Sequence, residues 1–493
     1  MNKRFFAIAL AIAVATWAGS SKAAESRPGL KPCRLQGLEN DAWCGVLKRP
    51  LDPAKPQGTQ IDIAFAVIPA LARNRKPDPV VFFAGGPGQS AMDLAGPVSR
   101  MLARLSNRRD VVLIDQRGTG RSAPLLCEDT APTAPLAEVL DNARQIEKLR
   151  ACRIRLQALP HGDLRHYTTW VAMQDADAVR VALGAAKVDI VGGSYGTRAA
   201  LEYLRQFPQA VRRAVIDGVA PPDMVLPASF STDNQAALDA VFTACEAEPA
   251  CRTRHPALRN EWHGLLDSLP REVNVTHPVT GASQRVRLTR DGLISLVRGP
   301  LYAPILASAL PQAMADAAHG RFEGLVGLAG ALGGGRAGRI SEGMHFSVVC
   351  SEDFPRLDQA ADVPGADFGS SFAAMYRDVC KDWPRGDVPP AFYTVPPAAM
   401  PVLLLSGGAD PVTPPRHGER IAKALGAKAR HVVVPQAGHG VMAIGCMRDA
   451  LFRFIDVDSG DEALKVDASC AATMPRPPAF QPVTAPSGTE AGK

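Results

Sequence analysis

The sequence lacks the features that mark nucleic-acid-binding and membrane-spanning proteins. Its Lys and Arg residues are scattered among a similar number of Asp and Glu residues, and no basic run is interleaved with aromatic side chains. The apolar run at residues 5–18 is too short for a comfortable membrane span. We therefore expect neither a nucleic-acid partner nor stable insertion into a membrane.

Signatures of metal and phosphate sites are also absent. No two cysteines are spaced as C-x-x-C, and no histidines cluster beside a cysteine, so the usual zinc-ligand patterns do not occur. The glycine-rich stretch GGPGQS at residues 85–90 lacks the Gly-Lys-Ser/Thr that completes a phosphate-binding loop. We predict a protein that works without a metal ion or an organic cofactor.

The amino terminus has the pattern of a secretory signal. Lys3 and Arg4 precede the apolar run, and small residues at 21–23 follow it at the positions that signal peptidase reads. An uncleaved anchor is the alternative, which the shortness of the run disfavours. We predict that residues 1–23 are removed and that the protein is exported, to a periplasm or to the medium. Loss of the leader's basic residues lowers the formal charge from +6 to +3.

The ten cysteines fall into couples that are close in sequence, with long cysteine-free stretches between them. An even number of cysteines in an exported chain is typical of a disulfide framework. Sequence alone leaves the connectivity open, and pairing of nearest neighbours is the simplest arrangement. It predicts the disulfides Cys33–Cys44, Cys127–Cys152, Cys245–Cys251, Cys350–Cys380 and Cys446–Cys470.

Short apolar runs separated by helical patterns indicate an α/β fold. Continuous apolar runs are typical of parallel strands that are covered on both faces. The run at residues 60–68 instead alternates apolar and polar residues at its start, and together with the run at 42–51 it predicts an antiparallel edge. We expect a mostly parallel sheet with helices on both faces, built from strands at residues 42–51, 60–68, 79–84, 111–114, 188–191, 213–219, 401–406 and 429–434.

The alternation of strands and helices is interrupted in the middle of the chain. From about residue 222 to 396, alanine-rich helical patterns alternate with loops, and residues 273–288 resemble a small hairpin. This organisation predicts a core in two parts, residues 24–221 and 397–475, with a mainly helical cap insertion between them. The Pro-rich residues 476–493 are expected to form a disordered tail.

The stretch VDIVGGSYGTRAA, residues 188–200, predicts a strand, a sharp turn and a helix. Gly192 and Gly196 flank Ser194, and small residues at these two positions let the strand and helix pass closely around a strained serine. Such a serine projects its hydroxyl outward as a nucleophile. The alternative is an ordinary N-capping serine in a glycine-rich connection.

Two later loops supply partners for this serine. Asp410 follows the strand at 401–406, and His439 follows the strand at 429–434. Singly, each has a simple explanation, because Asp-Pro often opens a turn and a His between glycines can be merely exposed. Together they give the order Ser, Asp, His at the carboxyl ends of parallel strands, which favours a catalytic triad.

The loop at residues 85–90 is a candidate oxyanion hole. Glycines after a strand let backbone N–H groups approach a reacting carbonyl closely. A plain tight turn is the alternative.

These motifs resemble those of a known family. The stretches GGPGQS, DQRGTGRS at 115–122, GGSYGT at 192–197, GGADPVTP at 407–414 and AGHG at 437–440 are similar to those of α/β-hydrolase serine exopeptidases. The resemblance is to the proline iminopeptidase and tripeptidyl aminopeptidase family, in its secreted branch with a TAP-like C-terminal region. One departure is Ala84, where relatives often carry His.

The resemblance implies roles for single residues. Ser194 is then the nucleophile, His439 the general base and acid, and Asp410 the group that orients the imidazole. Backbone N–H groups of Tyr195 and Gly86 form the oxyanion hole.

An aminopeptidase must also bind the substrate's free amine, and Glu352 and Asp353 in the cap are our candidates, with ordinary surface acids as the alternative. The predicted function is a secreted serine aminopeptidase that releases short N-terminal peptides or residues from oligopeptides through an acyl-enzyme. The alternatives are an esterase or amidase with the same triad, and a non-catalytic binding protein.

Overall fold

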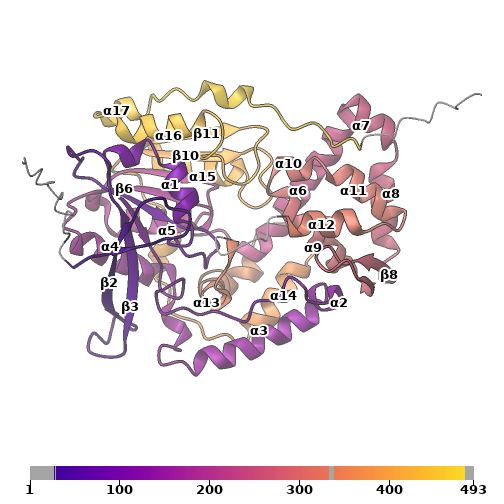
Figure 1. The fold of residues 1–493 in the computed structure, drawn as a ribbon, viewed down its shortest axis with the longest axis horizontal. Coiled ribbons are helices and arrows are strands. Elements are labelled where there is room, and N and C mark those ends of the chain that lie inside the picture. Colours follow the sequence, from indigo (N-terminus) through magenta and orange to yellow (C-terminus); the bar gives the residue numbers. More distant parts are fainter. Residues whose placement is uncertain (1–26, 28, 332–337, 483–493) are drawn as a thin grey trace, which may run out of the picture.

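The computed structural model describes residues 27, 29–331 and 338–482. Its main sheet has the strand order β1-β2-β3-β5-β4-β6-β7-β10-β11 (Figure 1). Strands β1, β2 and β3 pair antiparallel with their neighbours, and β3 is also antiparallel to β5. The remaining strands of this sheet, β5, β4, β6, β7, β10 and β11, run parallel to one another. The predicted mostly parallel α/β architecture is confirmed.

The observed strands follow the apolar runs of the sequence closely. They are β1 Lys31–Cys33, β2 Ala42–Pro50, β3 Gln60–Ile68, β4 Val80–Phe83, β5 Val111–Ile114, β6 Val188–Gly193, β7 Val211–Asp217, β10 Val402–Gly407 and β11 Ala429–Val434. Strand β1 was not predicted, because it is short and carries Pro32. It pairs with β2, and the Cys33–Cys44 disulfide joins the same two strands.

Alternate side chains of each strand enter different hydrophobic cores. Val81 and Phe83 of β4 pack into one cluster, whereas Val80 and Phe82 pack into the other. This alternation follows from the pleat of a strand, whose successive side chains point to opposite faces. The first cluster is covered by α4 Thr169–Ala182, α5 Tyr195–Gln206 and α15 Pro415–Leu425, and the second by α1 Ala95–Met101 and α16 Met447–Asp456.

A mainly helical segment lies between β7 and β10 and forms one side of the molecule in Figure 1. Much of it surrounds a third hydrophobic cluster that includes the fully buried Trp262. Its elements are α6 Leu226–Ala247, α7 Pro249–Arg254, α8 Leu258–Asp267, β8 Arg271–Thr276, β9 Ser283–Leu288, α9 Arg290–Leu301, α10 Pro304–Ala307, α11 Leu310–Ala318, α12 Glu323–Gly330, α13 Glu342–Glu352 and α14 Ser371–Cys380.

This helical segment also packs against an earlier part of the chain. Helix α3, Asn142–Gln157, lies beneath α13 and α14 in Figure 1, and the short helix α2, Leu136–Val139, is drawn to the right of α14. Leu136 and Leu140 belong to the same hydrophobic cluster as Trp262. The sequence analysis places these residues in the first part of the core, because packing between distant segments leaves no local pattern.

All five predicted disulfides are present. The structure joins nearest-neighbour cysteines throughout and leaves no free cysteine among the described residues. The Cys350–Cys380 bond connects α13 to α14, and Cys446–Cys470 connects the start of α16 to the segment after it. Disulfides of this number are typical of exported proteins.

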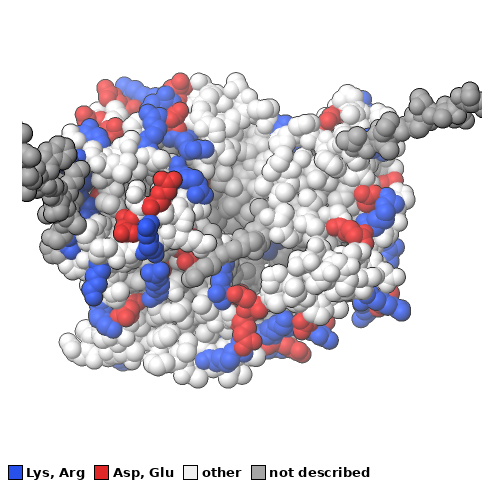
Figure 2. Space-filling model, viewed as in Figure 1, with Lys and Arg blue, Asp and Glu red and all other residues white. Residues whose placement is uncertain are grey.

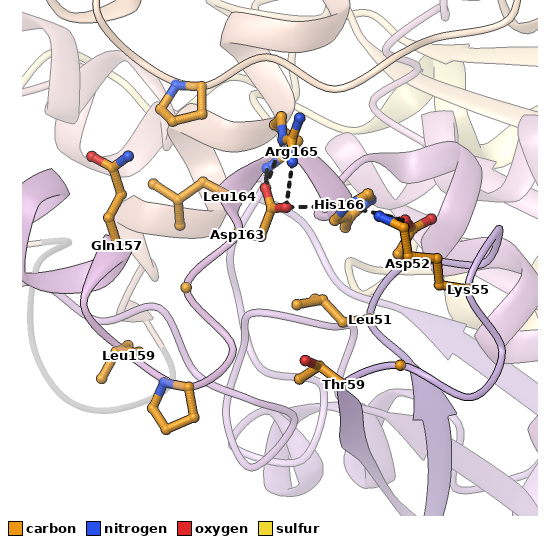
Figure 3. Close-up of a pocket in the computed structure, with 14 residues that line it drawn as sticks. Leu51, Asp52, Lys55, Thr59, Gln157, Leu159, Asp163, Leu164, Arg165 and His166 are labelled. Carbon is orange, nitrogen blue, oxygen red and sulfur yellow. Dashed lines mark hydrogen bonds and ion pairs between the residues drawn. The ribbon is translucent and has the colours of Figure 1, made fainter.

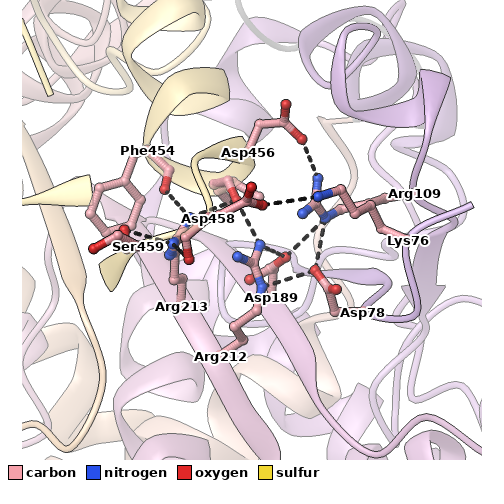
Figure 4. A network of polar contacts seen from close by, with 11 residues as sticks. Lys76, Asp78, Arg109, Asp189, Arg212, Arg213, Phe454, Asp456, Asp458 and Ser459 are labelled. Carbon is pink, nitrogen blue, oxygen red and sulfur yellow. Dashed lines mark hydrogen bonds and ion pairs between the residues drawn. The ribbon is translucent and has the colours of Figure 1, made fainter. Parts of the chain in front are cut away.

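A buried network of charges lies at the amino ends of β4, β6 and β7 (Figure 4). Arg212 contacts Asp78 at 2.9 Å and Asp189 at 2.6 Å, and Arg109 contacts Asp78 at 2.8 Å and Asp456 at 2.6 Å. Burial raises the pKa of Asp189 to about 8, although Arg212 opposes the shift. The network anchors the end of α16 to the edge of the sheet that is opposite Ser194.

The two ends of the chain are described only in part. The predicted signal peptide lies outside the described residues. No described helix is both apolar enough and long enough to cross a bilayer. At the start of the segment predicted to be a disordered tail, the N–H groups of Ala479 and Phe480 donate to Glu248 and to the carbonyl of Ser308. Residues 483–493 lie outside the described part.

Candidate active site

Ser194 occupies a strained turn between β6 and α5. Its backbone angles are φ 56° and ψ −127°, which a non-glycine residue rarely adopts. A Cβ on Gly192 would lie 2.5 Å from the carbonyl oxygen of Gly196, and a Cβ on Gly196 would lie 2.1 Å from that of Phe83. Only glycine fits at both positions, which explains the G-x-S-x-G pattern.

Asp410 and His439 meet at the carboxyl ends of β10 and β11. The Nδ1 atom of His439 lies 2.8 Å from Oδ2 of Asp410. The other carboxylate oxygen accepts the backbone N–H groups of Val412 and Thr413, each at 2.9 Å, and the Thr413 hydroxyl donates to Oδ2 at 2.8 Å. Burial alone raises the pKa of Asp410, but His439 and these donors outweigh it and lower the pKa.

The pKa of His439 is raised. Burial opposes the charged imidazolium, but the nearby carboxylates of Asp410 and Asp217 favour it more strongly. The arrangement directs the Nδ1 proton to Asp410 and leaves Nε2 to act as a base.

Ser194 and His439 line the same cavity, of about 620 Å³. No hydrogen bond joins the Ser194 hydroxyl to another described side chain, and catalytic hydrogen bonds often tighten only when substrate binds. The cavity also contains Gly86 and Tyr195, so the residues predicted for the triad and the oxyanion hole, apart from the buried Asp410 behind His439, face one space.

The glycine loop after β4 lies against the serine. A Cβ on Gly85 would lie 3.2 Å from Cβ of Ser194. Tyr195 is the first residue of α5, so its N–H has no acceptor within the helix. The buried Asp115 holds the loop in place, because it accepts the Ser90 hydroxyl at 2.7 Å and the Met92 N–H at 3.0 Å.

Glu352 and Asp353 lie elsewhere than the sequence analysis expects. Both are fully buried against Arg198, whose guanidinium donates to Asp353 at 3.0 and 3.1 Å and reaches Glu352 at 3.5 Å. Glu352 also accepts the N–H and the hydroxyl of Thr169. These bonds tie α13 to α5 and α4, and neither carboxylate lines the catalytic cavity.

Burial determines the electrostatics of the cluster formed by Arg198, Glu352 and Asp353. Burial raises the pKa of Glu352 to about 7, although Arg198 opposes the shift. Burial also raises the pKa of Asp353. A substrate amine would have to displace Arg198 to reach either carboxylate.

Three charged side chains line the cavity instead, Glu342, Arg298 and Asp217. Glu342 is the first residue of α13, and Arg298 lies in the last turn of α9. The sequence does not distinguish Glu342 or Arg298, because each is an ordinary helix residue whose neighbours come from distant segments. No local signal in the sequence marks them.

Asp217, at the end of β7, is a third residue that sequence reasoning missed. Its Oδ2 accepts the N–H groups of Val441 and Met442, each at 2.7 Å, and its carbonyl accepts the N–H of Ser194 at 2.8 Å. Burial raises its pKa to about 6, against the effect of the two N–H donors and His439. An acidic residue at the end of a predicted parallel strand is the signal that could have found it.

Other cavities lack the nucleophile. One of about 460 Å³ lies near the β2–β3 turn, where His166 is 3.3 Å from Asp163 and 3.9 Å from Asp52 (Figure 3). Another, of about 940 Å³, shares Ile340, Glu342 and Phe346 with the catalytic cavity. In Figure 2 the molecule is hollowed between its two sides.

Comparison with protein families gives two matches. Residues 78–292 match the family described as alpha/beta hydrolase fold, and residues 365–470 match the family described as TAP-like protein. The first match includes Ser194, and the second includes Asp410 and His439.

Individual relatives carry different names. The serine protease Hip1 of Mycobacterium tuberculosis is 25% identical over 437 residues, which cover 80% of this chain and 82% of Hip1. A tripeptidyl aminopeptidase of Streptomyces lividans is 34% identical over 196 residues, or 38% of this chain and 36% of that protein. The carboxylesterase B of Mycobacterium tuberculosis is 28% identical over 433 residues, or 78% of each chain.

The fold, the strained serine and these matches agree. The chain belongs to the α/β-hydrolase family, in the group with a TAP-like C-terminal region, and it is a serine hydrolase.

Proposed function

We propose that this protein is an exported serine aminopeptidase that releases short N-terminal fragments from oligopeptides. The observation that carries the proposal is a carboxylate, Glu342, in the wall of the cavity that holds Ser194 and His439. The similarity to a serine protease and to a tripeptidyl aminopeptidase supports peptide substrates. The five disulfides support export to a periplasm or to the medium.

The geometry suits an acyl-enzyme mechanism. His439 takes the proton of the Ser194 hydroxyl as the oxygen attacks the peptide carbonyl, and Asp410 stabilises the imidazolium. The N–H groups of Tyr195 and Gly86 donate to the oxyanion. His439 then protonates the leaving amine, and water hydrolyses the acyl-enzyme by the same steps in reverse.

Glu342 is suited to hold the substrate's ammonium group. Its Oε2 is buried and has no hydrogen-bond partner among the described residues. Burial raises the pKa of Glu342 and Asp129 adds to the effect, whereas the backbone N–H groups of Glu342 and Cys127 and the charge of Arg339 oppose it. A substrate ammonium would supply a partner for Oε2, and an N-acylated substrate would leave that oxygen without one.

The two residues just before Glu342 contact the oxyanion loop. The neighbouring Ser341 donates its N–H to the carbonyl of Gly88 at 2.9 Å, and a Cβ on Gly86 would lie 3.2 Å from the Ile340 side chain. The start of α13 is therefore fixed against the oxyanion loop. Glu342 replaces Glu352 and Asp353 as the candidate for amine binding.

An esterase is the second candidate. Much of the cavity wall is apolar, with Leu226, Phe230, Phe346 and Val412 among its residues. Such a wall also suits the acyl chain of a small ester, and a relative is named carboxylesterase B. The same triad cleaves either bond.

The test compares a tripeptide anilide that has a free amine with its N-acetylated form. We expect kcat/KM to be at least about tenfold higher for the free amine. Glu342→Gln should remove this preference, and Ser194→Ala should abolish turnover of both. Equal rates on the two anilides, or rapid cleavage of simple esters alone, would contradict the aminopeptidase proposal.

A further inference from the structure

Arg298 presents a guanidinium group to the catalytic cavity. The group lies over the rings of Phe230 and Phe372, with distances of 5.0 and 4.9 Å to the ring centroids. One of its nitrogens lies 3.5 Å from the Tyr302 hydroxyl. Cation–π contacts with two aromatic rings restrain the guanidinium within the cavity wall.

The charge of Arg298 is not compensated by the protein. No carboxylate of the described residues lies within 4.0 Å of it, and its Nε is buried without a hydrogen-bond partner. Arg198 makes a clear contrast, because Asp353 accepts two of its N–H groups. A fixed guanidinium without a counterion is a binding group for a planar anion such as a carboxylate.

Tyr302 places Arg298 on the side of the cavity next to His439. The carbonyl of Tyr302 accepts the backbone N–H of His439 at 2.9 Å, and its ring meets the imidazole edge to face at 5.2 Å. In the proposed mechanism His439 protonates the leaving amine. The fragment that leaves therefore departs along the wall that carries Tyr302 and Arg298.

We propose that Arg298 binds the free α-carboxylate of the leaving fragment, so that the enzyme selects short peptides with an unblocked C-terminus. This inference rests on the proposed peptidase function. Tyr302 bridges Arg298 and His439, because its hydroxyl lies 3.5 Å from a guanidinium nitrogen and its ring packs against the imidazole. Because an extended chain advances about 3.3–3.6 Å per residue, the leaving fragment is about one to three residues long.

Another charged residue of the cavity, Glu342, fits the same substrate. Glu342 lies on the side of the oxyanion loop and is suited to the ammonium group, whereas Arg298 lies on the side of His439. A short peptide carries these two opposite charges at its two ends. The enzyme then acts on products that an endopeptidase has already shortened.

The test measures kcat/KM for alanine-rich peptides of four to six residues, each as the free acid and as the C-terminal amide. For the wild-type enzyme we expect the acid to be preferred by about tenfold to a hundredfold. Arg298→Met keeps much of the stacking volume but removes the charge, and should bring the ratio of acid to amide to about one. Since the ratio is compared within each variant, a general loss of activity does not mimic this result.

Arg259→Met is the matched control. Arg259 stacks on Phe242 at 4.5 Å in the same helical segment but does not line the cavity, so this variant should keep the wild-type ratio. An amide that carries Asp in the leaving fragment tests the other source of a carboxylate. Its cleavage should remain as slow as that of the plain amide.

Three outcomes would overturn the inference. Equal rates on acid and amide in the wild type, or a preference for the acid that survives in Arg298→Met, would show that Arg298 does not bind the α-carboxylate. Either result would leave the proposed peptidase function standing. Full recovery of the rate with the Asp-containing amide would show that Arg298 binds a side-chain carboxylate of the substrate and not its α-carboxylate. Failure to cleave any free-amine peptide would instead refute the proposed function.

Discussion

The imidazole of His439 contacts the carboxylate of Asp410 at 2.8 Å, although the two residues are 29 positions apart and lie in different loops. The contact requires adjacent parallel strands, β10 and β11, that end at the same edge of the sheet. It fixes which imidazole nitrogen carries the proton, and the first prediction follows from it.

Asp410→Asn should remove most of the activity without removing the fold. The amide keeps the shape of the carboxylate but no longer favours the Nδ1 proton or the imidazolium. We expect kcat to fall by roughly 10⁴-fold, the size of this effect in serine proteases. Steady-state kinetics measure the loss, and an unchanged circular dichroism spectrum serves as the control. A loss of less than tenfold would argue against Asp410 as the orienting residue.

Asp217→Asn should shift the pH dependence of catalysis to lower pH. His439 must be neutral to act as a base, and the carboxylates of Asp410 and Asp217 both raise its pKa. Removal of one negative charge lowers the pKa of His439, so the acid limb of the kcat/KM profile moves down in pH. A purely structural role for Asp217 would lower activity at every pH and leave the limb in place.

Glu352→Gln should weaken the pH dependence of stability. Burial raises the folded-state pKa of Glu352 to about 7, above its value of 4.5 in a model peptide. The folded state therefore binds a proton more tightly than the unfolded chain, and the unfolding free energy falls as pH rises between these two values. The glutamine side chain of the variant does not ionise, so this contribution to the pH dependence is lost. Urea titrations at pH 5 and pH 8 should give a smaller difference for the variant than for the wild type, and an equal difference would contradict the assignment.

Gly196→Ala should prevent correct folding of the nucleophile turn. The added Cβ would lie 2.1 Å from the carbonyl oxygen of Phe83, and backbone cannot yield there without separating β4 from α5. We expect loss of soluble protein or several kcal/mol of destabilisation. Gly264→Ala is the control, because nothing lies within 4 Å of its added methyl group and the residue is in a helix. This second variant should be neutral or slightly more stable.

Loss of the Cys350–Cys380 disulfide should destabilise the region that carries Glu342. The bond closes a loop with a sequence separation of 30, whereas Cys245–Cys251 closes one of 6. Loop-closure entropy gives about 3–4 kcal/mol for the longer loop and less for the shorter one. Thermal unfolding of the two double alanine variants should show the larger decrease for Cys350 and Cys380. The reverse order would show that strain or packing, and not loop length, dominates.

The sequence predicts the frame of this molecule because local chemistry specifies it. The apolar runs that become β4, β5, β6 and β10 need no distant information, and neither do the glycines around Ser194. The order Ser194, Asp410, His439 was recognised because each residue follows such a run.

The residues that surround the triad were harder to predict, because their surroundings come from other parts of the chain. Glu352 and Asp353 are two adjacent acidic residues, which in sequence suggest a site for an ammonium group. In the structure both form ion pairs with Arg198, which is far away in sequence. Glu342 and Arg298 have no distinguishing neighbours in sequence. Their importance follows only from the cavity that they share.

The bonds of Asp217 have a consequence for the growing chain. This residue receives the N–H of Ser194 from one side and those of Val441 and Met442 from the other. With the roles proposed above, a chain that has been synthesised only as far as β10 holds the nucleophile but neither its base nor the loop that seats against Asp217. In the proposed mechanism, hydrolysis therefore requires the docked carboxyl-terminal segment, which supplies His439 and the loop that donates to Asp217.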